Sequence, residues 1–282
     1  MKKILIPTDF SKEAQNAGDV ASKIARKFNA EIIFLHSIEV TSTESINASG
    51  APSNFDSYAD SMLVHESIQR ANEEMHKLIK EPIFDGLVVS QLIKIGSPFS
   101  HIYEVVEEGV DFIVMGTKGA FGLSEVLIGS NTEKVVRRAK CPVLSVKDKV
   151  DDSVFEKIVY ATEIAENEDK VIKCLKDIQS AFDSKIFMVW INTPNNFKPD
   201  SDTKPKLRNF VTKHGLTNCD ISVFNDAIEE DGIRNFADEV GAGMIAMGTS
   251  SHTGLSRIIR GSIAEDMVNH AKRPVLTVSM KD

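Results

Sequence analysis

The stretch GTKGAFGLSEVLIGSNT, at residues 116–132, decides how the rest of the sequence is interpreted. It follows the apolar run DFIVM at 111–115 and precedes the helical pattern EKVVRRAK at 133–140, so it links the end of a strand to the start of a helix. Its glycines are spaced as Gly116, two residues, Gly119, nine residues and Gly129, with Ser130 next. Glycine lets backbone amides approach a ligand closely and adopts positive φ without strain.

This link predicts a phosphate cradle at the start of the helix. Free N–H groups and the helix dipole at Gly129, Ser130, Asn131 and Thr132 favour a phosphate, and the hydroxyls of Ser130 and Thr132 add polar donors. The alternative is a glycine turn before a capped helix, with no ligand. The sequence has no GK[ST], which excludes a Walker-type P-loop, and no GxGxxG follows any strand.

Together with CPVLSV at 141–146 and the opening KKILIPTDFS at 2–11, this spacing resembles the nucleotide-binding motif of the universal stress protein family. The resemblance covers the whole chain, as two tandem copies. It implies an α/β fold of two Rossmann-like (adenine nucleotide alpha hydrolase-like) domains, each a five-stranded parallel sheet of order 3-2-1-4-5 with helices on both faces. It also implies binding of ATP, or of ADP or AMP, with Mg²⁺ accompanying the nucleotide.

An internal repeat supports two copies. The segment 116–146 aligns with 248–278, at an offset of 132, with about half the positions identical, and KKILIPTDF at 2–10 aligns with EKIVYATEI at 156–164, at an offset of 154. The first copy is therefore 154 − 132 = 22 residues longer between these segments. We expect domains at 1–147 (the leading copy) and 156–282 (the trailing copy), joined by a charged linker at 148–155.

Strands alternate with helices along both copies, which predicts βαβ units and a parallel sheet covered on both faces. In the leading copy the expected strands are 2–7, 31–37, 86–96, 111–115 and 143–146, and the expected helices 11–28, 58–80, 98–109 and 130–140. In the trailing copy the expected strands are 157–161, 185–191, 219–224, 243–247 and 275–280, and the expected helices include 167–182, 228–240 and 262–272. A loop at 192–205 is expected to lead into one further helix that ends near 215.

Ligands of such sheets bind at the carboxyl ends of the strands, where the strand order reverses. Asp9, Ser37 and Gly116 each follow a strand end. The resemblance implies that Asp9 faces a ribose and that the main chain of Ser37 meets adenine, whereas the alternative for Asp9 is a helix N-cap or a first-turn acid beside Ser11. Lys118 is either a phosphate contact or a solvated lysine. The predicted nucleotide-binding residues are Pro7, Thr8, Asp9, Ser37, Met115, Gly116, Lys118, Gly119, Gly129, Ser130, Asn131 and Thr132.

The trailing copy departs from the motif. Ser251 replaces the second glycine, and Glu163 replaces the aspartate, which adds a methylene where a ribose would lie. Gly248, Gly261 and Ser262 remain. We expect a degenerate copy that serves folding and pairing, with at most a weak second site at these three residues.

The composition excludes several classes of protein. The net charge of −8, without a run of Lys and Arg, argues against nucleic-acid and anionic-membrane partners. Three cysteines without metal or redox spacing, and no long apolar segment, predict a cytoplasmic protein. The seven histidines include no HxH or HExxH, so no metal site is expected, and His36 is expected to be a satisfied core histidine. Neither a nucleophile elbow nor a clear general base is present, so we predict no catalytic residues and at most slow ATP hydrolysis.

The resulting hypothesis is a stress-response regulator that acts through nucleotide-dependent conformation or association. The alternatives are a nucleotide-free scaffold for protein interactions and a slow ATPase. The last strands, VLSV and VLTV, are sheet edges that are expected to pair within one chain as a pseudo-dimer, and a homodimer is a further expectation. The segment 41–80 is expected to act as a lid over the adenine side.

Overall fold

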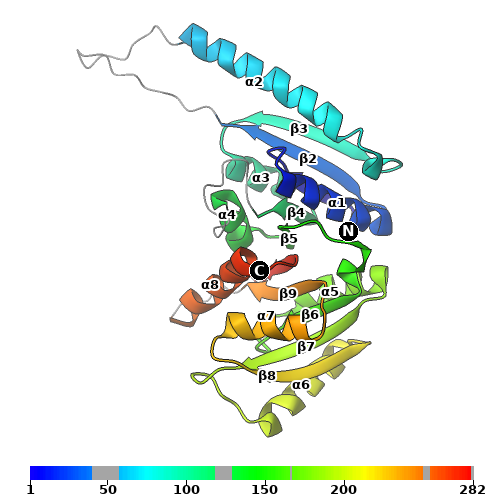
Figure 1. The fold of residues 1–282 in the computed structure, drawn as a ribbon, viewed down its shortest axis with the longest axis vertical. Helices are drawn as coiled ribbons and strands as arrows, with labels where there is room; N and C mark the ends of the chain where they lie inside the picture. The colour runs from blue at the N-terminus through cyan, green and yellow to red at the C-terminus, as the bar shows by residue number, and fades with distance from the viewer. Residues whose placement is uncertain (40–56, 118–128, 166, 250–254, 281–282) are drawn as a thin grey trace, which may run out of the picture.

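The structure, a computed structural model, describes residues 1–39, 57–117, 129–165, 167–249 and 255–280, with only the backbone described at 57–61 and 255–262 (Figure 1). The lid hypothesis rests on 41–56 for its flexible part, and these residues lie outside that description. The loop residues Lys118, Gly119 and Ser251 also lie outside it.

The described strands form one ten-stranded sheet in the order β3-β2-β1-β4-β5-β10-β9-β6-β7-β8 (Figure 1). The expected order 3-2-1-4-5 is therefore present in each copy, and the two sets join into a continuous sheet. The strands are β1 (Lys3–Pro7), β2 (Glu31–Ile38), β3 (Val89–Ile95), β4 (Phe112–Gly116), β5 (Val143–Val146), β6 (Lys157–Ala161), β7 (Lys185–Asn192), β8 (Cys219–Asn225), β9 (Met244–Thr249) and β10 (Val275–Ser279).

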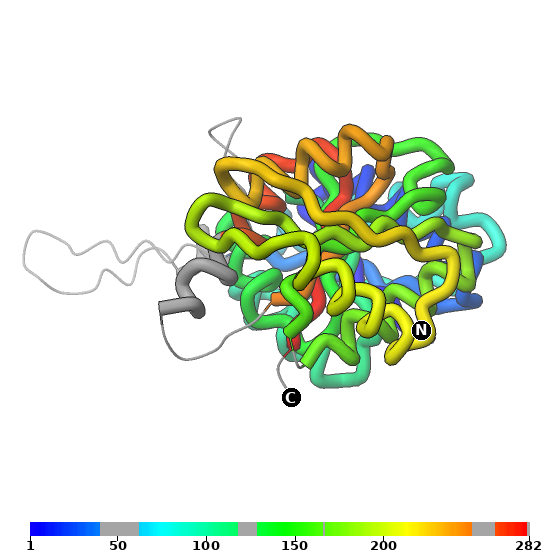
Figure 2. Tube along the Cα trace, turned by 90° about the horizontal axis from the view of Figure 1, so that it is seen from below, coloured from blue at the N-terminus to red at the C-terminus, as the bar shows by residue number. Residues whose placement is uncertain are grey.

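Helices cover both faces of this sheet, as the view from below shows (Figure 2). They are α1 (Lys12–Phe28), α2 (Ser57–Leu78), α3 (Pro98–Glu107), α4 (Ser130–Arg138), α5 (Asp169–Phe182), α6 (Asp200–His214), α7 (Glu229–Glu239) and α8 (Leu255–His270), with short 3₁₀ turns η1 (Pro82–Phe84) and η2 (Asp152–Phe155). One apolar core lies under α1, α2, α5 and α6, and a second lies under α3, α4, α7 and α8.

Successive strand residues alternate between these two cores, which explains the continuous apolar runs in the sequence. In β1, for example, Ile4 and Ile6 enter the first core and Leu5 enters the second, and all three are fully buried. Strands buried on both faces in this way are typical of parallel sheets between two helical layers.

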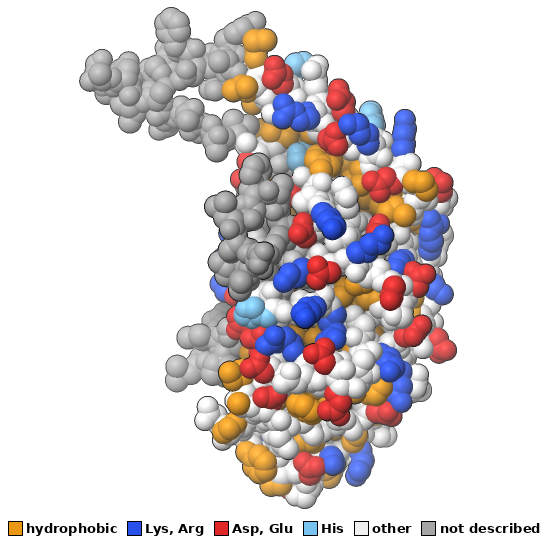
Figure 3. All heavy atoms as spheres, in the orientation of Figure 1, with side chains coloured by type: hydrophobic (Ala, Val, Ile, Leu, Met, Phe, Trp, Pro, Cys, Tyr) orange, Lys and Arg blue, Asp and Glu red, His pale blue; other side chains and the backbone are white. Residues whose placement is uncertain are grey.

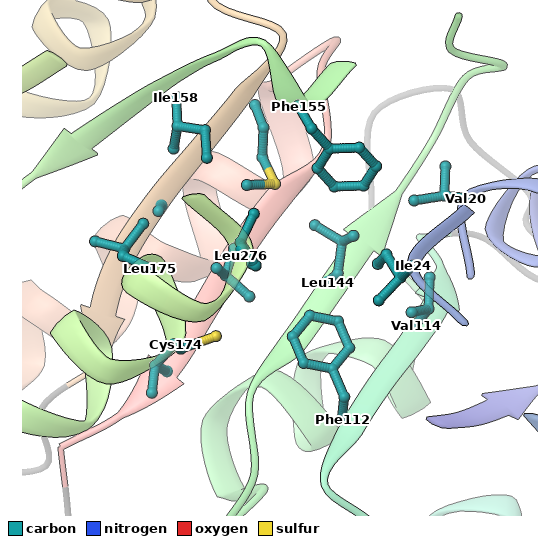
Figure 4. Packing of buried hydrophobic residues seen from close by; sticks show 14 of the residues in the cluster. Val20, Ile24, Phe112, Val114, Leu144, Phe155, Ile158, Cys174, Leu175 and Leu276 are labelled. Atoms are coloured by element: carbon teal, nitrogen blue, oxygen red, sulfur yellow. The ribbon is translucent and has the colours of Figure 1, made fainter. Parts of the chain in front are cut away.

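The copies meet through their last strands. β5 and β10 pair antiparallel, with Leu144 opposite Leu276. Both leucines are fully buried in a core that continues from Val20 and Ile24 on one side to Leu175 on the other (Figure 4). Pairing the two strands covers backbone groups that each would otherwise expose at an edge.

The expected linker at 148–155 packs against the core. It contains η2, whose Phe155 is 1% exposed and stacks on Phe182 at 4.1 Å between ring centroids. Lys23 of α1 reaches across to the Asp152 carboxylate at 2.8 Å.

Two helices of the trailing copy begin earlier than their sequence patterns predict. The expected loop at 192–205 is present only at 193–199, because α6 already begins at Asp200 and includes Pro205. Burial of Thr203, Leu207 and Phe210 along one side of α6 outweighs the loss of one helical hydrogen bond at the proline. Similarly, α8 begins at Leu255, seven residues before the predicted start at Ser262.

Candidate functional site

The turn after β1 has a fixed geometry. The Thr8 amide donates to the Leu35 carbonyl at 2.9 Å, and the Phe10 amide donates to the Thr8 hydroxyl at 3.0 Å. Phe10 adopts a φ of 64°, in the left-handed region that bulky residues rarely enter. Such strain, of about 1–3 kcal/mol, persists only where surrounding contacts enforce it, and it is concentrated at functional sites.

Asp9 contributes to the start of α1. Its Oδ1 accepts a hydrogen bond from the Ser11 amide at 3.1 Å, while Ser11 caps the helix by accepting from the Ala14 amide at 3.2 Å. Asp9 therefore lies before the N-cap and fixes the turn into α1, whereas Ser11 is the N-cap and Glu13 is the acid of the first turn. A carboxylate offers about four acceptor positions, so this role is compatible with an additional ribose contact.

The end of β2 borders the same turn. The pairing of β1 with β2 ends at Pro7 and Leu35, and β2 continues to Ile38 beside β3. The Ser37 hydroxyl lies 2.9 Å from His101 Nδ1 of α3. His36 Nδ1 lies 2.8 Å from the Thr8 carbonyl oxygen, and its ring is 4.6 Å from that of Phe10. His36 thus has the predicted polar partner, but it is half-buried and lies outside both cores.

The end of β4 lies next to β1, where the strand order reverses. Met115 is buried in the second core and Gly116 ends the strand. An added Cβ at Gly116 would lie 2.9 Å from the Glu13 carbonyl carbon and 3.0 Å from the Ala14 amide nitrogen. Gly116 therefore has a packing reason for being glycine, since it lets β4 approach the first turn of α1.

The helix predicted after the motif begins at Ser130, with Gly129 as its N-cap residue. The Gly129 amide donates to the Thr117 carbonyl at 2.8 Å, and the Gly129 carbonyl accepts from the Glu133 amide at 3.1 Å. Gly129 has no side chain with which to cap this helix, and no side-chain cap is present among the described residues. The first-turn amides therefore point out of the helix at the end that contacts the carboxyl end of β4 through Thr132 and Gly116.

Two details of the predicted cradle are different from expectation. Gly129 has a φ of −63°, so positive φ is not the reason for glycine there, although close approach of a ligand remains a reason. The Thr132 hydroxyl was expected to face the phosphate, but it donates to the Gly116 carbonyl at 3.0 Å and Thr132 is 4% exposed. This hydrogen bond joins the first turn of α4 to the end of β4.

The described residues of this site fit a phosphate group. An uncapped helix start presents backbone N–H groups and the positive end of a dipole. Beside it, the buried Thr117 hydroxyl has no hydrogen-bond partner among the described residues. Buried polar atoms are rarely left without a partner, and each such exception in a native fold requires an explanation.

The trailing copy repeats the first turn. The Ile164 amide donates to the Thr162 hydroxyl at 2.8 Å, and Ile164 has a φ of 58°. A β-branched residue with this φ is a clear outlier, and it occupies the position that corresponds to Phe10. The strained turn is therefore shared by both copies.

The rest of the trailing cleft is filled. Glu168, 4% exposed, accepts hydrogen bonds from the hydroxyls of Tyr160 and Thr162, and its Oε1 accepts from the Ala165 amide at 2.9 Å. Met280 packs on Gly248, with its sulfur 2.7 Å from where a Cβ would be.

The remaining cavity at this cleft is about 50 Å³, against the 300–1,000 Å³ that is typical of ligand sites. Gly261 and Ser262, the other two residues of the predicted weak site, lie within α8 and not at its start. Backbone amides inside a helix donate within the helix, so these two cannot present an N-terminal cradle like that of α4.

The parts of the chain with described coordinates contain no cluster of three His, Cys, Asp or Glu side chains arranged to hold a metal ion. Within the same residues, no helix is sufficiently long and apolar to cross a membrane. On the face in Figure 3, acidic and basic side chains are interspersed.

The family model described as "Universal stress protein family" matches residues 1–147 and 227–279. The chain belongs to the universal stress protein family. A universal stress protein of Methanocaldococcus jannaschii is 33% identical over 160 residues, which cover 52% of this chain and 96% of that protein. A second one from the same organism is 35% identical over 148 residues, covering 52% of this chain and 82% of that protein.

Solved structures show that the whole fold occurs elsewhere. The crystal structure of a universal stress protein from Archaeoglobus fulgidus matches with a TM-score of 0.73 at 20% identity, and the match covers 99% of this chain and 98% of that one. A putative universal stress protein from Pseudomonas aeruginosa matches with a TM-score of 0.64 at 19% identity, covering 99% and 93%. At these identities the likeness concerns the fold alone.

Several residues that shape the two clefts were not singled out from the sequence. Thr117 lies inside the motif, directly after the first glycine, and this position could have indicated that its hydroxyl faces the cleft. Glu168 and Met280 gave no signal, because they reach the trailing cleft from a helix start and from the end of the last strand. Only the folded chain brings these two side chains to Gly248.

Proposed function

We propose that the leading copy of this universal stress protein binds an adenine nucleotide: ATP, or ADP or AMP. The observation that carries this proposal is the uncapped start of α4 at Ser130, placed at the carboxyl ends of β4 and β1 where the strand order reverses. The motif glycines and the orphan Thr117 hydroxyl support it.

In this proposal each end of the nucleotide has its own contacts. The phosphates lie against the amides of Gly129, Ser130 and Asn131, with Lys118 and Gly119 completing the loop. Asp9 accepts from the ribose, and the main chain around Ser37 meets adenine. Mg²⁺ accompanies the phosphates and is held mainly by them, in keeping with the lack of a metal-binding cluster in the described residues.

We assign a regulatory role to this binding. The two copies are proposed to be domains, 1–147 and 156–282, in a cytoplasmic protein that responds to stress. The antiparallel β5–β10 pair holds the two copies in a fixed relative position. Nucleotide bound in the leading cleft therefore changes the surface around the start of α4 and not the pairing of the copies. The trailing cleft binds nucleotide weakly or not at all, since Met280 and Glu168 occupy it.

Calorimetric titration of ATP with Mg²⁺ tests the proposal. We expect a Kd in the micromolar range, about 8 kcal/mol, for the unmodified chain. Gly129→Val places a branched side chain at the uncapped helix start, at a φ that valine tolerates, so binding is lost while the fold is kept. The matched control is Gly261→Val, at the corresponding residue inside α8, which keeps the affinity of the leading cleft. Equal affinities of all three proteins would refute the assignment.

A nucleotide-free scaffold is the second candidate. It is favoured by the finding that Gly116 and Thr132 have roles in packing that need no ligand. Mass analysis that finds no nucleotide in the purified protein, together with no thermal shift from ATP and Mg²⁺, would select the scaffold.

A further inference from the structure

A groove of about 540 Å³ lies in the trailing copy, away from the filled cleft. It opens between the turn after β6, the end of β7 and α6, on the face that also carries α5. Of the described residues, only Glu163 and Ala165 line both the groove and the cleft, because the cleft continues instead toward Met247 and Gly248. The groove is therefore a separate place on the surface, with a volume in the range of small-molecule sites.

The base of this groove is apolar. It contains Trp190, which is 4% exposed, Phe210, which is 6% exposed, and the strained Ile164. The Trp190 indole is held in place, since its Nε1 donates to Asn192 Oδ1 at 3.1 Å and the Lys198 ammonium lies 4.3 Å from its ring centroid. A rigid apolar base of this kind needs no rearrangement to accept the flat or aliphatic body of a ligand.

The rim of the groove is basic. Among the described residues that line it, Lys198, Lys206 and Lys213 are basic and Glu163 is acidic, although the chain as a whole carries a net charge of −8. Lys206, Asn209 and Lys213 lie at i, i+3 and i+7 of α6, on one face of the helix.

Two other lysines of the trailing copy, one on α6 and one at the start of β7, are neutralised. Lys204 pairs with Asp200 at 2.6 Å, and Lys185 pairs with Asp220 at 2.7 Å. Within the described residues, by contrast, Lys206 and Lys213 have no ion pair. Two unneutralised ammonium groups above an apolar base form a complementary surface for a small molecule with an anionic head and an apolar body.

We propose that this groove is a binding site for a small organic anion, a phosphomonoester or carboxylate whose head group meets Lys206 and Lys213 and whose apolar body lies on Trp190 and Phe210. The site is independent of the nucleotide cleft in the leading copy. It gives the trailing copy a ligand of its own, although the cleft that corresponds to the nucleotide site is filled.

The tryptophan makes the proposal directly measurable, because Trp190 is the sole tryptophan of the chain. The full-length protein is titrated with phenyl phosphate, benzoate and phenol, and the emission of Trp190 is followed. Phenyl phosphate, benzoate or both are expected to change the emission saturably, with a Kd of about 1 mM, and the tighter of the two identifies the head group. Phenol, which has the same ring without the charge, is expected to bind at least tenfold more weakly.

Two variants separate the rim from the rest of α6. The double change Lys206→Gln and Lys213→Gln is expected to weaken anion binding about tenfold or more, whereas Lys204→Gln on the same helix leaves it unchanged. Gly129→Val, which removes nucleotide binding in the leading cleft, is expected to leave anion binding in the groove unchanged, which keeps this result distinct from the fate of the nucleotide proposal. No saturable change with either anion, equal binding of phenol, or equal affinity of the double variant and the unmodified chain would overturn the site.

Discussion

The two motif glycines that the structure describes, Gly116 and Gly129, are predicted to respond differently to the same substitution. At Gly116, an alanine Cβ would lie 2.9–3.0 Å from backbone atoms of Glu13 and Ala14, closer than real Cβ contacts. Backbone atoms of a helix start cannot turn away as a flexible side chain does, so β4 and α1 must separate. Overpacking of this kind costs about 1–3 kcal/mol. Gly116→Ala therefore lowers the free energy of unfolding by that amount.

At Gly129, the φ of −63° and ψ of 142° suit any residue. The weaker N-cap preference of alanine is offset by the smaller entropy of its unfolded chain, so Gly129→Ala stays within about 0.5 kcal/mol of the unmodified protein.

Urea denaturation followed by circular dichroism measures both variants, and a thermal melt provides a second estimate, at roughly 2–4 °C for each kcal/mol. The packing account is wrong if Gly116→Ala is as stable as the unmodified protein. It is equally wrong if both variants lose the same stability.

Three further outcomes follow from the structure. Tyr160→Phe removes a hydroxyl that donates to the buried Glu168 carboxylate and is expected to cost about 1–3 kcal/mol in urea denaturation; no loss would mean that the carboxylate does not depend on it. Arg137→Gln removes the two hydrogen bonds to Glu265, at 2.7 and 2.8 Å, that join α4 to α8. Because the arginine is 56% exposed, we expect the free energy of unfolding to fall by at most about 1 kcal/mol, and by less in high salt. A larger loss that salt does not change would contradict this. Burial raises the pKa of the Cys141 and Cys174 thiols to about 12 and that of Cys219 to about 11, so a thiol reagent at pH 8 should label the native protein slowly. The free energy of unfolding should fall as pH rises above the ordinary pKa of 9.0, because only the thiols of the unfolded chain ionise there. Rapid labelling of the native chain would refute the burial argument.

The class of fold was predictable from the sequence because local patterns determine it. Apolar runs such as those of β2 and β4 mark strands buried on both faces, and alternation with amphipathic helices leaves few arrangements other than a covered parallel sheet. The cap at Ser11 and the helix start at Ser130 were also predicted, since both depend on residues next to one another in the chain.

The early starts of α6 and α8 were not predictable in the same way. Proline and asparagine around residue 199 favour a loop locally, whereas the burial of Leu207 and Phe210 against the sheet extends the helix through Pro205. Tertiary packing overrides local preference there.

The chemistry of the two clefts was only partly predictable. The glycine spacing indicates where a phosphate cradle lies, but it does not reveal that the Thr132 hydroxyl is used within the fold. The filling of the trailing cleft depends on Met280, more than thirty residues after Gly248, and on the buried Glu168. Contacts between distant residues of this kind have no periodic pattern in the sequence.

The number of nucleotides bound per chain tests the central claim most directly. Native mass spectrometry of the full-length protein with ATP and Mg²⁺ should show one adenine nucleotide per chain, absent from Gly129→Val and retained by Gly261→Val. A chain that carries no nucleotide at saturating ATP, or a Gly129→Val variant that still carries one, would contradict the assignment of the leading cleft.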